Sequence, residues 1–179
     1  MIDPVIELIL CAVLALLFAA AAWHKVSEHG RFTASLGAYA LVPTLLVAPS
    51  ALLLPVLEGA LAVGLLHAPT RQPAAIASMA LLALYTGAIV VNLARGRRQI
   101  DCGCFAASAR IALSPRLVAR NLVLIGAAGL LVAPVRARTL VWIDAFTVMA
   151  AVLALWLLAT AAQRLAQTGP ALERLGGHR

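Results

Sequence analysis

The sequence predicts an all-α protein whose helices cross a membrane several times. Hydrophobic residues make up 63% of the 179 residues and charged residues only 12%, whereas soluble domains carry roughly 45–50% and about 25%. The mean hydropathy is +0.98. A soluble domain has too little polar surface to cover so many apolar side chains. We therefore exclude a cytosolic enzyme, a disulfide-rich secreted domain and a disordered chain.

The predicted spans follow from helix length. A membrane-spanning helix needs about 20 mostly apolar residues, within a range of about 17–25. Five stretches meet or approach that length: 5–23, 49–67, 73–94, 115–134 and 139–162. The first lacks the basic start of a secretory signal, so we expect it to be retained. Arg120 and Asn121 interrupt the fourth, so the sequence predicts a bundle of four to five spans.

The remaining residues connect or follow these spans. Residues 24–48 are mixed in polarity, and three of their apolar side chains recur at helical spacing, which predicts a short interfacial helix. These side chains are Phe32, Leu36 and Tyr39. We assign residues 1–163 to one membrane-embedded helical bundle and residues 164–179 to a polar C-terminal tail.

The basic residues indicate orientation. Lys and Arg number 14 against 7 Asp and Glu, and they lie between and beyond the apolar stretches instead of on one soluble face. We therefore expect a lipid bilayer and no nucleic acid as partner. With five spans, 11 basic residues fall on one side and 3 on the other. The positive-inside rule then places the N-terminus outside and the connection 95–115 in the cytoplasm.

The most specific chemical motif is RGRRQIDCGCF, residues 95–105. Cys102 and Cys104 flank Gly103, which permits the bend that a disulfide between them requires. So small a ring should be strained, and strained disulfides tend to be labile and oxidising. Neighbouring arginines favour the thiolate, whereas Asp101 opposes it. We predict reversible dithiol chemistry; inert cysteines and a metal site stay as alternatives, although the loop offers fewer ligands than the four that zinc prefers.

Two further residues stand out inside the predicted spans. Glu58 lies in the middle of the second span, where an ionisable group is costly and calls for a partner or a function. Its candidate partners are His24, Lys25, Tyr85 and Asn92. Two roles stay open for Glu58, a proton relay coupled to the thiols and a hydrogen-bonded strut. Cys11, alone in an apolar helix, is expected to serve packing.

No resident cofactor or metal is expected. A haem held by two histidines needs both at a similar depth, and His24 and His67 end consecutive antiparallel spans. The sequence contains no phosphate-binding glycine loop and no nucleophile elbow. A quinone enters only under one of the alternative functions given below.

The run NLARGRRQIDCGCF, residues 92–105, followed by Ser114 and Arg120-Asn121, resembles the MauE family of methylamine-utilisation membrane proteins, which are related to DoxX-like proteins. The similarity covers a core of about 5–134, and the stretch 139–162 is then an extra span. Ala106 departs from the family pattern, which continues with glycine. Earlier residues agree with the pattern: Lys25, Phe32, Tyr39, Pro43, Pro55 and Glu58.

The resemblance implies a multi-pass protein of the bacterial inner membrane. Such a protein would assist disulfide formation or cofactor biogenesis in a periplasmic client such as methylamine dehydrogenase, beside a thioredoxin-fold MauD-like partner. By analogy, Cys102 and Cys104 are the redox pair of a thiol–disulfide oxidoreductase. The client folds outside, whereas the charge count places the pair inside. Either reducing equivalents cross the membrane, or one stretch does not span, or the arginines serve partner binding.

Two other functions fit the same residues. One is a non-catalytic membrane scaffold or export partner for the client, in which the cysteines are incidental. The other is a quinone-linked oxidoreductase subunit of the DoxX type, with Glu58 near the quinone head.

Overall fold

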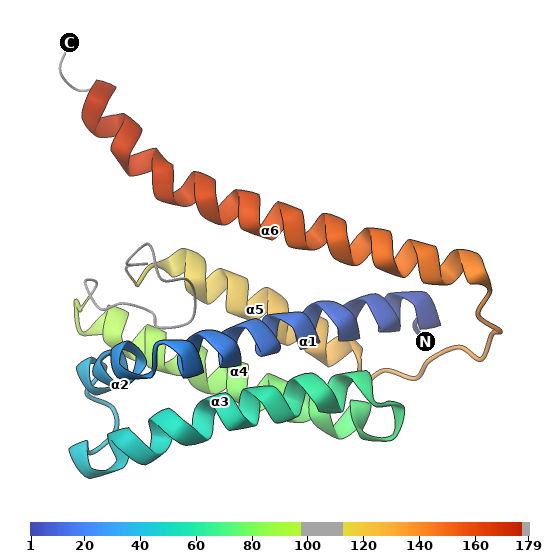
Figure 1. The fold of residues 1–179 in the computed structure, drawn as a ribbon, viewed down its shortest axis with the longest axis horizontal. Helices are drawn as coiled ribbons and strands as arrows, with labels where there is room; N and C mark the ends of the chain where they lie inside the picture. Colours follow the sequence, from blue (N-terminus) through green and yellow to red (C-terminus); the bar gives the residue numbers. More distant parts are fainter. Residues whose placement is uncertain (98–112, 177–179) are drawn as a thin grey trace.

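The computed structural model describes residues 1–97 and 113–176, with side chains described to residue 162. These residues form six α-helices: α1 (Pro4–Ser27), α2 (His29–Ala38), α3 (Thr44–Leu66), α4 (Arg71–Ala94), α5 (Pro115–Leu130) and α6 (Trp142–Gly176). A short 3-10 turn, Ala68–Thr70, joins α3 to α4. Figure 1 shows α1, α3, α4 and α5 side by side, with α6 lying across α1. The predicted all-helical class is confirmed for these residues.

Four of the helices are long and apolar enough to cross a membrane. They correspond to the predicted stretches 5–23, 49–67, 73–94 and 139–162, although the helix α6 continues to Gly176, well past the predicted end at 162. α3 begins earlier than expected, at Thr44, and its backbone stays helical through Pro49 and Pro55. The interfacial helix expected within 24–48 is α2.

α5 is shorter than the stretch 115–134 from which we expected a fifth span. It has 16 residues and is about 24 Å long at 1.5 Å per residue. Pro134 prevents the helix from continuing, because proline disfavours a helical conformation in the residue before it. α5 nevertheless packs along α4 and returns the chain to the end of the bundle where α1 begins (Figure 1).

The bundle therefore has two distinct ends. One end carries α2, the end of α4 and the start of α5. The other carries Ile2, the α3–α4 turn and the segment 131–141 (Figure 1). The second end is closed by a parallel bridge, in which the Ile2 amide donates to the Pro134 carbonyl at 3.0 Å and the Arg136 amide donates to the Ile2 carbonyl at 2.9 Å.

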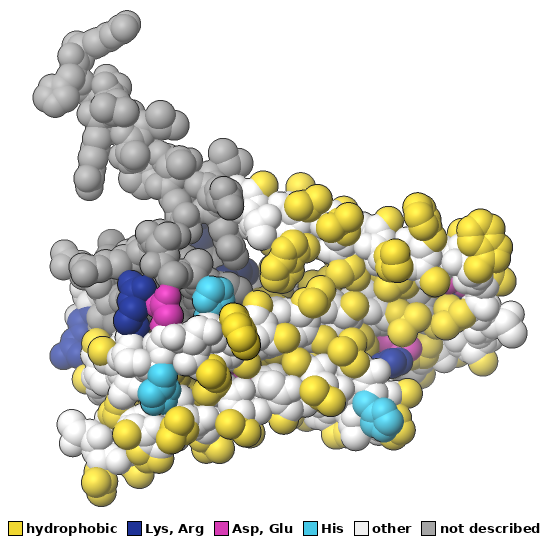
Figure 2. Space-filling model, in the orientation of Figure 1, with side chains coloured by type: hydrophobic (Ala, Val, Ile, Leu, Met, Phe, Trp, Pro, Cys, Tyr) yellow, Lys and Arg dark blue, Asp and Glu magenta, His cyan; other side chains and the backbone are white. Residues whose placement is uncertain are grey.

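The core lies between α1, α3, α4 and α5. Its small side chains let the helices approach closely, and Cys11 is one of them, only 2% exposed, as its expected packing role requires. The buried members of this core are Cys11, Leu14, Ala15, Phe18, Ala62, Leu65, Ala74, Ala75, Leu81, Leu82, Ala128 and Leu131. Apolar side chains also cover the described outer surface (Figure 2), as expected where lipid replaces water.

Candidate functional site

The predicted sulfur pair falls outside the described residues. Asp101, Cys102, Gly103 and Cys104 all lie within 98–112. The flanks of that segment are well placed by the fold. α4 is terminated by Gly96, whose φ of +73° suits glycine, and Leu113 packs beside Tyr39 and Ile89. The segment therefore starts and finishes at the end of the bundle that carries α2.

Glu58, well inside α3, forms a buried ion pair with Lys25 of α1. Lys25 Nζ lies 2.5 Å from Glu58 Oε1, and both side chains are 1% exposed. The long lysine side chain extends from the last turn of α1 to the middle of α3. Two of the four partners proposed from the sequence, Lys25 and Tyr85, contact the carboxylate; His24 and Asn92 are placed elsewhere.

Aromatic rings complete the surroundings of the lysine. The Tyr85 hydroxyl of α4 donates to Glu58 Oε1 at 2.8 Å. Lys25 Nζ also lies 5.3 Å from the centroids of the Phe32 and Tyr85 rings, within the range of a cation–π interaction. Phe32 belongs to α2, so this interfacial helix contributes a ring to the surroundings of the ammonium group.

The energetics of this pair favour a fixed arrangement. Desolvating two charges is costly, and only good geometry and further hydrogen bonds compensate for it. Here one carboxylate oxygen accepts from both Lys25 and Tyr85. Removing one member of such a buried pair costs about 3–5 kcal/mol, because the other charge is left without a counter-charge. The cluster therefore joins α1, α3 and α4 through one carboxylate oxygen.

The second carboxylate oxygen of Glu58, Oε2, takes no part in these bonds. Glu58 Oε2 has no hydrogen-bond partner among the described residues. Glu58 also lines a cavity of about 20 Å³, together with Arg120 and Asn121 of α5. A volume of roughly 10–15 Å³ is enough for one water molecule. The site can therefore hold a water molecule between Glu58 and α5.

Sequence reasoning missed two parts of this site. Arg120 and Asn121 were treated as interruptions of a span, yet they line the cavity beside Glu58. Two polar residues at the start of an apolar helix were the signal, because polar groups in a membrane bundle turn towards other polar groups. Phe32 was expected on the apolar face of an interfacial helix, but nothing in its spacing indicated a lysine beneath it.

A second group of charges, more exposed than the first, lies at the end of the bundle opposite α2. Arg71 of α4 pairs with Glu7 of α1 at 3.0 Å. Arg138 donates to the carboxylates of both Asp3 and Asp144 at 3.0–3.2 Å, forming what we call the Arg138 clamp. The two bonds from Arg138 and one from the Val5 amide hold the pKa of Asp3 below its ordinary value of 3.8.

Comparison with known proteins decides the family. The family model described as methylamine utilisation protein MauE matches residues 3–134, which include α1 to α5, the Glu58 site and the C-x-C segment. The chain belongs to the MauE family. No solved structure matches it.

Curated MauE proteins agree with this assignment. The methylamine utilization protein MauE of Paracoccus denitrificans is 44% identical over 124 residues, covering 69% of this chain and 67% of the relative. Those of Methylophilus methylotrophus and Methylorubrum extorquens are 43% and 41% identical, over 57% and 66% of this chain and 54% and 64% of their own lengths. The chain is thus a multi-pass membrane protein of the MauE family, and α6 follows the matched region.

Proposed function

We propose that this MauE-family protein carries out thiol–disulfide exchange that helps to mature a periplasmic dehydrogenase of the methylamine-utilisation system. The observation that supports this most directly is the C-x-C pair, Cys102 and Cys104, within the matched range 3–134. The chain has three cysteines. Because Cys11 is buried in the core, any exchange with another protein falls to the other two.

The proposed exchange is a two-electron step. A client dithiol attacks the Cys102–Cys104 disulfide, a mixed disulfide forms, and the second client thiolate resolves it. The client gains one disulfide, while Cys102 and Cys104 receive two electrons and two protons as thiols. A thioredoxin-fold partner in its disulfide form reoxidises them by the reverse exchange. Asp101 and Gly103 are proposed to tune and bend the pair, and the bacterial inner membrane is the proposed location.

The test replaces each sulfur separately. Cys102→Ser and Cys104→Ser should abolish client maturation without reducing the amount of protein in the membrane, and Cys11→Ala serves as the matched control. Each serine variant keeps one thiol of the pair. Where that thiol is the one that bonds to the partner, a mixed disulfide should accumulate and be visible on a non-reducing gel. Full maturation in both serine variants would refute the redox role, and the absence of any mixed disulfide would favour the scaffold instead.

A further inference from the structure

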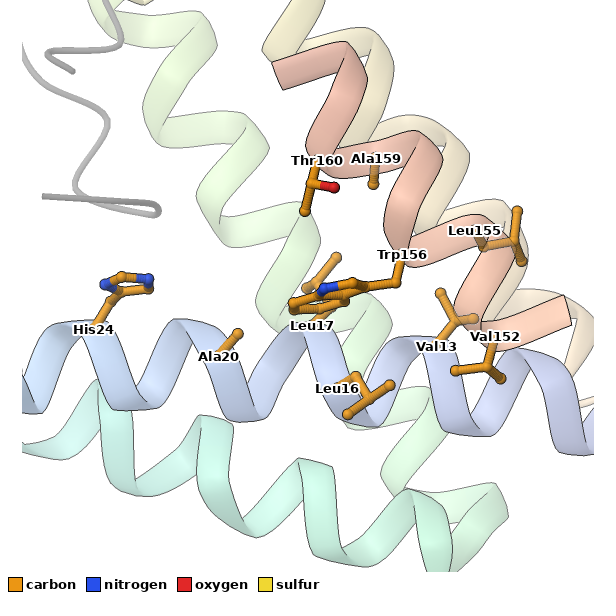
Figure 3. Close-up of a pocket in the computed structure, with 10 residues that line it drawn as sticks. All are labelled: Val13, Leu16, Leu17, Ala20, His24, Val152, Leu155, Trp156, Ala159 and Thr160. Atoms are coloured by element: carbon orange, nitrogen blue, oxygen red, sulfur yellow. The ribbon is translucent and has the colours of Figure 1, made fainter. Parts of the chain in front are cut away.

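A second cavity lies between α1 and α6 and does not include Glu58. Its volume is about 300 Å³, at the small end of the range for ligand pockets. The α1 side chains that line it form one helical stripe, ending at His24. The stripe beside it contains Leu14, Phe18 and Lys25 and faces the core. The cavity therefore lies on a different face of α1 from Lys25, with Leu17 between it and the core (Figure 3).

The walls of this cavity are apolar except at one end. The lining residues are Val13, Leu16, Leu17, Ala20, His24, Val152, Leu155, Trp156, Ala159 and Thr160. His24 and Thr160 are the last of these on their helices, and α1 and α6 run in the same direction (Figures 1 and 3). The polar groups thus lie towards the α2 end, and the apolar walls extend away from them. This distribution matches a molecule with a polar head and an apolar tail.

The polar groups favour a head that accepts hydrogen bonds and carries no charge. His24 and Trp156 each have a ring N–H, and neither bonds to another described side chain or backbone group. No described lining residue carries a fixed charge, so nothing there would balance a phosphate. Lys25, the next residue along α1, is committed to Glu58 on another face. The flat indole of Trp156, which projects from α6 towards α1 in Figure 3, suits a planar ring.

We propose that the α1–α6 cavity binds an isoprenoid quinone, with the ring between His24 and Trp156 and the first part of the tail along α1 and α6. Two quinone carbonyls match the two N–H donors, and the tail replaces lipid against the aliphatic walls. The described lining contains no cysteine. Quinone binding can therefore be tested independently of the proposed thiol chemistry.

The experiment uses the full chain in lipid nanodiscs and decylubiquinone as the probe. Trp23 and Trp142 are 72% and 80% exposed, so Trp23→Phe and Trp142→Phe leave Trp156 as the only tryptophan at little structural cost. We expect saturable quenching of Trp156 fluorescence. Ala159→Phe, which fills the cavity, should abolish it, whereas Ala154→Phe, at an exposed position of the same helix, should not.

The polar end is tested separately. His24→Leu should weaken decylubiquinone binding about tenfold, the usual scale for one lost hydrogen bond. Circular dichroism checks that each variant keeps its helices. Equal quenching in the Ala159→Phe and Ala154→Phe variants would overturn the proposal. The proposal would also be overturned if mass spectrometry found a phospholipid bound to the parent protein and absent from Ala159→Phe, and if decylubiquinone did not displace it.

Discussion

At the scale of single residues, the Lys25–Glu58 pair decides how the described part of the site behaves. An ionisable group inside an apolar helix is tolerated when a partner neutralises it, and here the partner comes from a helix 33 positions earlier in the chain. Tyr85 and Phe32 then fix the positions of the carboxylate and the ammonium. Glu58 Oε2 has no partner among the described residues, and Glu58 also lines a cavity the size of a water molecule.

The strut and the relay predict different results for a double substitution. Glu58→Gln alone should lower stability by about 3–5 kcal/mol, because Lys25 keeps a buried charge without its partner. Lys25→Met combined with Glu58→Leu should recover most of that loss, since apolar residues of similar volume can replace a buried ion pair. The midpoint of thermal unfolding in detergent measures both effects.

Client maturation in the double variant then separates the two roles. A strut predicts that maturation returns together with stability. A relay predicts a stable protein that no longer matures its client, because the group that exchanges the proton is gone. If the double variant were as unstable as Glu58→Gln, the argument that an unpaired buried charge causes the loss would be contradicted.

The Arg138 clamp makes a prediction about acid. Because the pKa of Asp3 is lower in the folded protein than in the unfolded chain, its contribution is complete above about pH 4. That contribution is lost as the pH falls through the lowered folded value. We expect hydrogen exchange at the Ile2 and Arg136 amides, which form the adjacent bridge, to lose protection in that range.

Asp3→Asn provides the control for this loss. It should reduce protection of the two amides by a few-fold at neutral pH, the modest scale of exposed ion pairs, and it should remove the part of the acid response that belongs to Asp3. Asp144 also accepts from Arg138, so Arg138→Gln should have the larger effect. An acid response unchanged in Asp3→Asn would show that another group opens the bridge.

At the scale of elements, the membrane topology depends on whether α5 crosses the bilayer. Its 16 residues are fewer than a standard span requires, yet it joins the two ends of the bundle as a full span would. Labelling of single cysteines tests this. In a cysteine-free background, Arg97→Cys and Ala137→Cys lie at exposed positions before and after α5. An impermeant maleimide on intact cells should label one and not the other.

The direction of that labelling tests the charge count. The positive-inside rule predicts that Ala137→Cys is labelled from outside and Arg97→Cys only after the cells are opened. The reverse pattern would place the C-x-C segment on the periplasmic side, where the client folds. The charge count, which places this segment in the cytoplasm, would then be wrong. Labelling of both positions from one side would mean that α5 does not cross the membrane.

At the scale of the whole molecule, the sequence predicted what depends on hydropathy and missed what depends on helix rotation. The long spans, α2 and the partners Lys25 and Tyr85 follow from apolar length and from the cost of an isolated charge at Glu58. The cavity that Glu58 lines and the cavity between α1 and α6 depend on which stripe of each helix meets which neighbour. Hydropathy carries no such information, so both could be found only in three dimensions.

The Arg138 clamp joins the first and last parts of the helical array. Asp3 and Arg138 are 135 positions apart in the chain, and five helices separate them. Since a chain emerges from the ribosome N-terminus first, Asp3 must wait for its partner until every intervening helix has been synthesised. Closure of this contact therefore requires that α1 to α5, but not α6, have been synthesised, and a nascent protein halted before Arg138 would lack the bonds that hold Asp3 in place.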